Sequence, residues 1–232
     1  EMKENTTAVQ VEKQKDRFIV TTQENHHYIG KAIIIATGKK PRKLNIPGED
    51  QFANRGVNYC ATCDGPLFSG QDVAVAGGGN SALDAILQLV NIVRHIDVVN
   101  ITPDFTGDAI MVAKIKQNPK ISIFHHCQIK KIQGEQFLSA LIIEDLKTKQ
   151  EKVLNVQGLF IEIGLLPNSH LNRDLLKNQD QEILINSRNE TNIPGLFAAG
   201  DVTDVPEKQI IIAAGEGAKA LLTAFRYLNS HY

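Results

Sequence analysis

Two cysteines three residues apart form the stretch of this chain with the clearest chemical potential. Residues 59–68 read YCATCDGPLF, so Cys60 and Cys63 are followed at once by Asp64. The C-x-x-C spacing holds two sulfurs close enough to form a short-loop disulfide, and it can lower the pKa of one thiol. Asp64 is placed to exchange a proton as thiol and thiolate interconvert. The stretch therefore predicts a redox pair, with a metal clip or a structural disulfide as alternatives.

A zinc site would need further ligands, because zinc takes four and one C-x-x-C motif supplies two. The third cysteine, Cys127, lies beside His125 and His126 in the sequence ISIFHHCQI. This run is expected to form a strand, in which neighbouring side chains point to opposite faces. We therefore expect no metal site, and we expect Cys127 to be a small buried residue.

A glycine fingerprint follows in the sequence AVAGGGNSA, which contains Gly77-x-Gly79-x-x-Ala82. It comes after an apolar strand and opens an amphipathic helix, the context that a dinucleotide site requires. Gly77 permits the tight turn, Gly79 lets a pyrophosphate approach the backbone, and Ala82 lets helix and strand pack closely. The helix N-terminus offers N–H groups to phosphates, and Asn80 and Ser81 can add side-chain donors. A tight turn that binds no ligand is the alternative.

The end of the next strand should distinguish NADH from NADPH. Asn100 stands there, which makes it our candidate at the ribose, and the acids Asp104 and Asp108 follow. No Lys or Arg occurs between Arg94 and Lys114. Because unpaired acids repel a phosphate, the sequence favours NADH. A flavin is also expected, since flavins are the usual intermediary between a nicotinamide hydride and a disulfide.

Composition excludes several classes of protein. The net charge of −1 gives no electrostatic reason to bind nucleic acid or an anionic membrane. No apolar run approaches the roughly 20 residues of a membrane span. The polar start lacks the apolar core of a secretion signal, and three cysteines in 232 residues do not suggest a disulfide scaffold. We therefore expect a cytoplasmic protein.

Hydrophobic patterning predicts an α/β fold. A linker rich in proline and glycine suggests a domain crossing near Pro47-Gly48. A hairpin is expected around KTKQ, and a helix is expected from about Ile210 to Leu228. Strands are expected at 17–22, 31–38, 72–76, 96–101, 158–168, 182–186 and in the run that ends at Gly200-Asp201.

Taken in order, these motifs resemble one known family over nearly the whole chain. YCATCDGPLF, VAVAGGGNSALDA, IEIGLLPN, TNIPGLFAAGDV and KQIIIAAGEGAKALLTAFRYL are similar to segments of the low-molecular-weight thioredoxin reductases. Within that family the resemblance is greatest to the flavoprotein subunit of alkyl hydroperoxide reductase. It implies two Rossmann-like domains. Residues 1–47 and 163–232 would form a split and incomplete FAD domain around a nicotinamide domain at 48–162.

The resemblance also implies roles for individual residues. Cys63 would face the flavin, Cys60 would exchange with the substrate disulfide, and Asp64 would be their acid–base partner. Gly164 would lie near the dinucleotide held by the glycine fingerprint. The residues matching the family's flavin segments are Ala36, Thr37, Gly38, Gly200, Asp201, Lys208, Gln209 and Ile210.

The chain departs from the family pattern in two places. Ile101, Thr102 and Thr106 stand where the NADPH-using reductases carry arginines, which again favours NADH. The glycine fingerprint for the ADP half of FAD is missing from the sequence, so only part of the FAD site is expected. We accordingly expect poor FAD retention and a tendency of the chain to aggregate.

The implied function is passage of electrons from NADH through FAD to the Cys60–Cys63 disulfide. From there they would reach a thioredoxin-like or peroxiredoxin-system protein. The nicotinamide domain is expected to rotate on hinges near Pro47-Gly48 and Gly164, because disulfide and nicotinamide must reach one flavin in turn. A homodimer is expected if the flavin domain is completed. The alternative is a nicotinamide-binding fragment without turnover.

Overall fold

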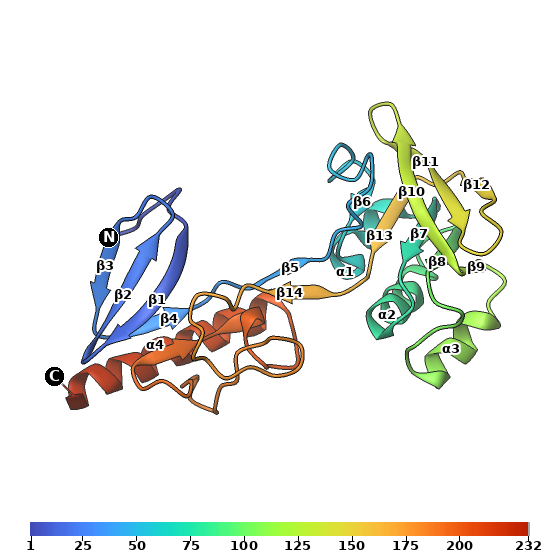
Figure 1. The fold of residues 1–232 in the computed structure, drawn as a ribbon. Helices are drawn as coiled ribbons and strands as arrows, with labels where there is room; N and C mark the ends of the chain where they lie inside the picture. The colour runs from blue at the N-terminus through green and yellow to red at the C-terminus, as the bar shows by residue number, and fades with distance from the viewer. Residues whose placement is uncertain (232) are drawn as a thin grey trace. The chain divides into compact units, whose positions relative to one another are not determined.

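The computed structural model describes residues 1–231 and divides the chain into two compact units. Unit 1 comprises Glu1–Lys40 and the chain from Leu165 onward, and unit 2 comprises Pro41–Gly164. One unit is therefore inserted into the other in sequence, as the colours of Figure 1 show. Helices and strands mix in the chain as predicted, and the α/β class is confirmed.

A parallel sheet forms the centre of unit 2, with strand order β6-β13-β7-β8-β9. Its strands read as apolar runs because both faces of such a sheet are covered. In β7, Val73 and Val75 pack towards the helices, while Ala74 and Ala76 pack towards an antiparallel sheet on the other side. The strands are β6 (Val57–Asn58), β7 (Asp72–Ala76), β8 (His95–Asn100), β9 (Ile121–His125) and β13 (Gly158–Ile161).

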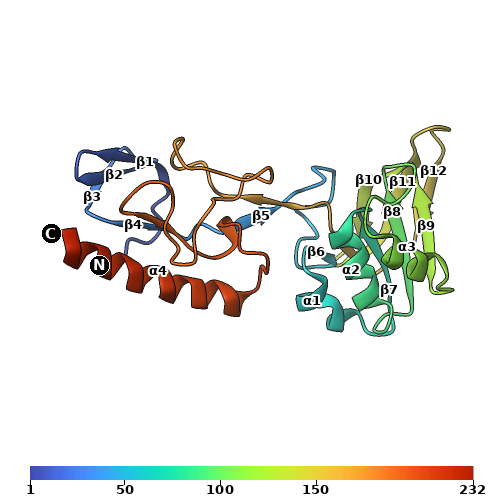
Figure 2. The same cartoon turned by 90° about the horizontal axis from the view of Figure 1, so that it is seen from below.

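Two layers cover this sheet (Figure 2). The helical layer contributes Leu83, Ile86 and Leu89, all fully buried, from one face of α2. The antiparallel layer has the order β10-β11-β12, and β11 and β12 form the predicted hairpin. These elements are α1 (Ala61–Asp64), the 3-10 helix η1 (Gly65–Phe68), α2 (Asn80–Leu89), α3 (Ala109–Lys116), β10 (Cys127–Gly134), β11 (Leu138–Asp145) and β12 (Glu151–Leu154).

Unit 1 holds an antiparallel sheet β1-β2-β3, the parallel pair β4 and β15, and the long helix α4. Its core gathers Val11 and Phe18 from the antiparallel sheet with Ile35 from β4 and Leu196 from β15. Strands β5 and β14 pair where the chain passes between the units. The elements are β1 (Ala8–Gln14), β2 (Arg17–Thr22), β3 (His27–Gly30), β4 (Ile33–Ile35), β5 (Lys39–Pro41), β14 (Leu165–Pro167), β15 (Leu196–Ala198), η2 (Gly200–Val202) and α4 (Ile210–His231).

Several predicted strands are shorter than expected or are interrupted. The run 31–38 reduces to β4, and the strand predicted at 158–168 breaks after Ile161, where Gly164 has φ of +101°. The run ISIFHHCQI divides at His126, whose φ of +52° separates β9 from β10. The strand predicted at 182–186 is wrong, because Ile183 makes only two isolated bridges, one to Lys177 and one to Thr203.

The first crossing between the units lies at Lys40–Pro41 and not near Pro47-Gly48 as predicted. The reason is that the loop that follows packs onto unit 2. The backbone N–H of Ile132 donates to the carbonyl oxygen of Pro47, and a Cβ on Gly48 would lie 2.4 Å from the carbonyl oxygen of Ile132. The loop around Pro47-Gly48 thus belongs to unit 2, and the second crossing falls at Gly164–Leu165, next to the predicted hinge at Gly164. Rotation of the nicotinamide domain about these hinges stays a prediction.

Candidate dinucleotide and disulfide sites

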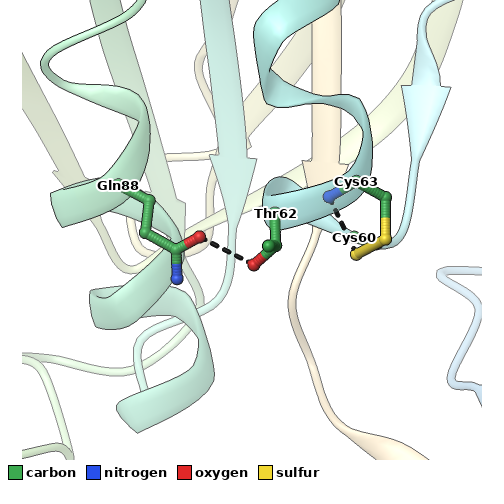
Figure 3. Close-up of a disulfide and its surroundings, with 4 residues drawn as sticks. All are labelled: Cys60, Thr62, Cys63 and Gln88. Carbon is green, nitrogen blue, oxygen red and sulfur yellow. Dashed lines mark hydrogen bonds between the residues drawn. A yellow bond between two sulfur atoms is a disulfide. The ribbon is translucent and has the colours of Figure 1, made fainter. Parts of the chain in front are cut away.

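The predicted redox pair is a disulfide at the start of α1 (Figure 3). Cys60 is the N-cap of this helix, and its Sγ accepts a hydrogen bond of 3.1 Å from the backbone N–H of Cys63. Cys63 is exposed and Cys60 is half-buried. Asp64 follows directly at the junction of α1 and η1. The disulfide is therefore within reach of another thiol.

Thr62, between the two cysteines, connects the disulfide turn to the next helix. Its hydroxyl donates a 2.7 Å hydrogen bond to Oε1 of Gln88 in α2 (Figure 3). Helix α2 begins at the glycine fingerprint. Its first residues therefore adjoin the dinucleotide turn, and Gln88 near its C-terminus contacts the disulfide turn.

The glycines of the fingerprint are required for three different reasons. Gly77 has φ of +137°, and a Cβ there would lie 2.3 Å from the carbonyl oxygen of Glu162. A Cβ on Gly78 would lie 2.5 Å from Oδ1 of Asn100. A Cβ on Gly79 would meet only Oγ1 of Thr106, at 3.8 Å. Gly79 thus leaves open the approach that a phosphate needs.

A cavity of about 420 Å³ opens beside this turn, within unit 2. It lies at the carboxyl ends of β7, β8 and β13, where open α/β sheets bind ligands. Most of the predicted dinucleotide residues line it, whereas Ala82 is fully buried beneath the turn. The predicted residues in the lining are Gly77, Gly79, Asn80, Ser81, Asn100 and Gly164.

Asn100 does not have a free amide to offer a ligand. Its Nδ2 donates to the carbonyl oxygen of Asp104 at 3.0 Å and lies 3.1 Å from Nδ1 of His125. Its Oδ1 accepts from the backbone N–H and the hydroxyl of Thr102. Asn100 is 2% exposed, so its side chain shapes the loop after β8. Oδ1 of Asn80 likewise accepts from the N–H of Asp108, at 2.8 Å.

The acids Asp104 and Asp108 of this loop both have partners, although the sequence argument for NADH assumed that they were unpaired. Asp104 pairs with Lys116 at 3.0 Å and lies 3.5 Å from Nε2 of His125. The hydrogen bond from Lys116 lowers the pKa of Asp104. The carboxylate of Asp108 caps α3 by accepting from the N–H groups of Ile110 and Met111. What remains of that argument is that neither Thr102 nor Thr106, which line the cavity, carries a positive charge.

Glu162 belongs to the site, although the sequence analysis did not single it out. It follows β13, lines the cavity and is half-buried. Burial raises its pKa to about 7, against the opposing effect of a hydrogen bond from the backbone N–H of Ala61. The sequence signal that could have identified Glu162 is an acidic residue in the otherwise apolar run GLFIEIG, two residues before Gly164.

In unit 1 the residues that match the flavin segments gather at one edge. Strands β4 and β15 are parallel, so the segments after them, residues 36–38 and 199–201, emerge together. Thr37 donates to the carbonyl oxygen of Asn168 at 2.7 Å, and Nδ2 of Asn168 donates back to Thr37. A Cβ on Gly38 would meet no atom within 4 Å, and Gly200 has φ of +73°. This open, glycine-bordered edge, with Ala36 exposed and Asp201 half-buried beside it, fits part of a flavin.

Lys208 is held by its own unit. Its Nζ donates to the carbonyl oxygen of Thr203 at 2.6 Å and lies 3.0 Å from the carboxylate of Glu182. Lys39 pairs with the same carboxylate. Lys208 therefore anchors the segment before α4, whereas Gln209 and Ile210 are exposed where the helix begins.

Two features are absent from residues 1–231. The described residues include no group of three or more His, Cys, Asp or Glu side chains placed to hold a metal ion. None of the helices in this part of the chain has the length and hydropathy of a membrane span.

Comparison with known proteins agrees with this geometry. The family model for pyridine nucleotide-disulphide oxidoreductases matches residues 1–217. An alkyl hydroperoxide reductase subunit of Staphylococcus epidermidis is 41% identical over 222 residues, which are 95% of this chain and 44% of that protein. The chain thus spans less than half the length of this curated relative.

Solved structures show the same fold. Thioredoxin reductase from Streptococcus pyogenes matches with a TM-score of 0.88 and 34% identity, over 97% of this chain and 74% of that one. Thioredoxin reductase from Giardia duodenalis matches with a TM-score of 0.87 and 30% identity over the same shares.

Proposed function

This chain belongs to the pyridine nucleotide-disulphide oxidoreductase family, and from that premise we propose that it is the disulfide-reducing part of an NADH-dependent flavoprotein. The observation that carries the proposal is the joint position of two features in unit 2. The Cys60–Cys63 disulfide and the glycine-lined cavity are both in this unit. The Thr62–Gln88 hydrogen bond ties the helix that leaves the cavity to the disulfide turn.

The residues present suit the two cofactors that this chemistry requires. The nicotinamide dinucleotide would lie in the cavity, with its pyrophosphate against Gly79 and Ser81. The flavin would lie against the edge formed by residues 36–38 and 199–201. When bound, the two cofactors supply a hydride and the means to pass its two electrons to a disulfide.

Each member of the redox group then has a distinct role. We assign Cys63 to the flavin side and Cys60 to exchange with the substrate disulfide. Asp64 supplies and removes the proton as the thiols interchange. Cys60 is half-buried, and its Sγ accepts a hydrogen bond from the backbone N–H of Cys63, so it is held at the start of the helix.

NADH is the proposed nicotinamide, because Thr102 and Thr106 offer no positive charge to a ribose phosphate. The proposed electron acceptor is a thioredoxin-like or peroxiredoxin-system protein, since the relatives include an alkyl hydroperoxide reductase subunit and thioredoxin reductases. A homodimer through a completed flavin domain is part of the same proposal.

The experiment combines spectroscopy and thiol counting on the full chain supplied with FAD. Anaerobic NADH should bleach the bound flavin and then expose two reactive thiols, which Cys60→Ser and Cys63→Ser variants should lack. NADPH at the same concentration should act at least tenfold more slowly. If NADH binds but neither bleaching nor new thiols appear, the chain is the nicotinamide-binding fragment of the alternative hypothesis. If neither nicotinamide binds, the proposed function is wrong.

A further inference from the structure

The loop after β8 forms one side of the cavity and is fastened to the glycine fingerprint. Its lining residues are Asn100, Ile101, Thr102 and Thr106. The backbone N–H of Thr106 donates to the carbonyl oxygen of Gly78 at 2.8 Å, and the side chain of Asn100 lies so close to Gly78 that no Cβ fits there. A change in the position of Asn100 would therefore move both the loop and the middle of the fingerprint.

The orientation of the Asn100 amide is fixed by the backbone. Its Oδ1 accepts from the N–H of Thr102 at 3.2 Å, and its Nδ2 donates to the carbonyl oxygen of Asp104 at 3.0 Å. The reversed amide would place a donor against this N–H and an acceptor against this carbonyl oxygen. Nδ2 therefore has a second hydrogen to donate, and Nδ1 of His125 lies 3.1 Å from it.

His125 must accept this hydrogen at Nδ1. The residue ends β9 and lies opposite Asn100 in the pairing of β8 with β9, so its place beside the amide follows from the strand register. A neutral imidazole has one donor and one acceptor nitrogen. The proton therefore lies on Nε2, which is 3.5 Å from a carboxylate oxygen of Asp104. Both ring nitrogens thus face partners in or before the loop.

A doubly protonated His125 would break this arrangement. Its Nδ1 would become a donor facing the donor Nδ2 of Asn100, and the amide cannot reverse without losing both backbone partners. The charged or titratable groups around the imidazole are Asp104 in the loop, Lys116 in α3, which pairs with Asp104, and the neighbouring His126. Burial lowers the pKa of His125, an effect that Asp104 opposes.

We propose that His125 is a positioning residue of the dinucleotide site, whose neutral imidazole holds Asn100 and the following loop in the form that receives the adenosine ribose. This rests on the proposed function, since the ligand is taken to be a nicotinamide dinucleotide. His125 does not itself line the cavity, so it acts through Asn100. Because the neutral form is required, binding should weaken as pH falls through the pKa of His125, which is below the ordinary 6.5.

Substitutions at His125 separate its hydrogen bond from its packing. His125→Phe keeps an aromatic ring against Phe105 but offers Asn100 no acceptor, so the affinity for NAD⁺ should fall about fivefold, the effect of one hydrogen bond. His125→Asn restores an acceptor near the position of Nδ1 and should recover most of that affinity. The matched control is His95→Phe. His95 is half-buried in β8 of the same sheet but contacts Ser122, so its variant should bind like the unmodified chain.

The test is calorimetric titration of the full chain with NAD⁺, which is stable in acid, between about pH 5 and pH 8, the window in which histidine titrates. The unmodified chain and His95→Phe should lose affinity at the acid end, whereas His125→Asn should keep the same affinity throughout. Nitrogen NMR of the His125 imidazole should show the proton on Nε2 at neutral pH. By linkage, bound NAD⁺ should lower the pKa of His125.

The outcomes distinguish this proposal from the proposed function. If NAD⁺ binds and His125→Phe binds it as tightly as the unmodified chain, the role of His125 is overturned and the reductase proposal stands. The same follows if the imidazole proton lies on Nδ1, or if the loss of affinity in acid persists in His125→Asn. If no nicotinamide dinucleotide binds at any pH, the proposed function is overturned and this proposal with it.

Discussion

At the scale of single residues, the glycine fingerprint separates two kinds of requirement. Gly77 is needed by the fold, since its φ of +137° and its contact with the carbonyl oxygen of Glu162 exclude a side chain. Gly79 has φ of −92° and a free space where a Cβ would stand. A glycine is needed at position 79 only if a ligand approaches the backbone there. Substitutions at Gly77 and Gly79 should therefore have different effects on stability and on binding.

Gly77→Ala should destabilise unit 2 by about 2 kcal/mol, the usual cost of a strained backbone, and should also abolish dinucleotide binding. Gly79→Ala should leave stability unchanged but weaken NADH binding at least tenfold, because the methyl group occupies the phosphate approach. Urea denaturation and NADH titration measure the two effects. Normal NADH affinity in Gly79→Ala would mean that the phosphates lie elsewhere.

Glu162 should also control the pH dependence of stability. Its pKa in the folded chain, about 7, is raised above the usual 4.5, so its contribution is complete below 4.5 and is lost as pH rises through 7. Above pH 7 the ionised carboxylate should cost about 3 kcal/mol. Glu162→Gln should therefore be more stable than the unmodified chain at pH 8 by that amount, and equally stable near pH 4.5. Equal stability at pH 8 would show that the carboxylate is well solvated.

The sequence predicts those parts of the site whose geometry depends on neighbouring residues, and it misses those that depend on residues far apart in the chain. The fingerprint and the C-x-x-C pair were found because turns and short disulfide loops depend on residues next to one another. Glu162 was not found, because its burial arises where β13 pairs with β6 and β7, far away in sequence. Asn100 was found, but its occupied amide depends on the loop after β8 and on His125.

At the scale of elements, the loop before the disulfide is fixed by one buried acid. Glu49 is 2% exposed, and its carboxylate accepts from the backbone N–H groups of Leu44 and Asn45 and from the hydroxyl of Tyr59. Burial and this hydrogen bond raise the pKa of Tyr59. Tyr59 precedes Cys60, so the same acid anchors both the loop and the entry to the redox turn.

Glu49→Ala should destabilise unit 2 by about 3 kcal/mol, because it leaves three partly buried donors without an acceptor. Asp50→Asn is the matched control. Asp50 is exposed and pairs only at the surface with Lys43, so its loss should cost less than about 0.5 kcal/mol. Urea denaturation followed by tyrosine fluorescence gives both values. Similar effects in the two variants would show that Glu49 does not hold the loop.

The prediction of elements failed where tertiary packing outweighs local pattern. The run EILIN has the alternation of a strand, yet Ile183 meets Thr203 and Lys177 only through isolated bridges. The carboxylate of Glu182 forms ion pairs with Lys39 and Lys208 and accepts a hydrogen bond from Asn178. Asn178 is close to Glu182 in sequence, but Lys39 and Lys208 come from two distant segments, which the local pattern of residues could not have placed together.

At the scale of the whole molecule, α4 is apolar on its outward face. The helical period brings Ile210, Leu221 and Phe225 to one side, and they are 89%, 62% and 62% exposed. The residues that α4 buries are small: Ala220, Thr223 and Ala224. This is the reverse of an ordinary surface helix, and it agrees with the expectation that the chain tends to aggregate.

Such a face should drive association of the chain with itself in a concentration-dependent way, because large exposed apolar patches rarely persist on monomers. Replacing Leu221 by Glu and Phe225 by Lys together should raise the dissociation constant for self-association at least tenfold in sedimentation experiments. The melting temperature should hold, since neither side chain is buried. The control is Leu176→Glu, which changes a residue 58% exposed in unit 1 but outside α4. A monomer at every concentration, or equal effects of both changes, would place the associating surface away from α4.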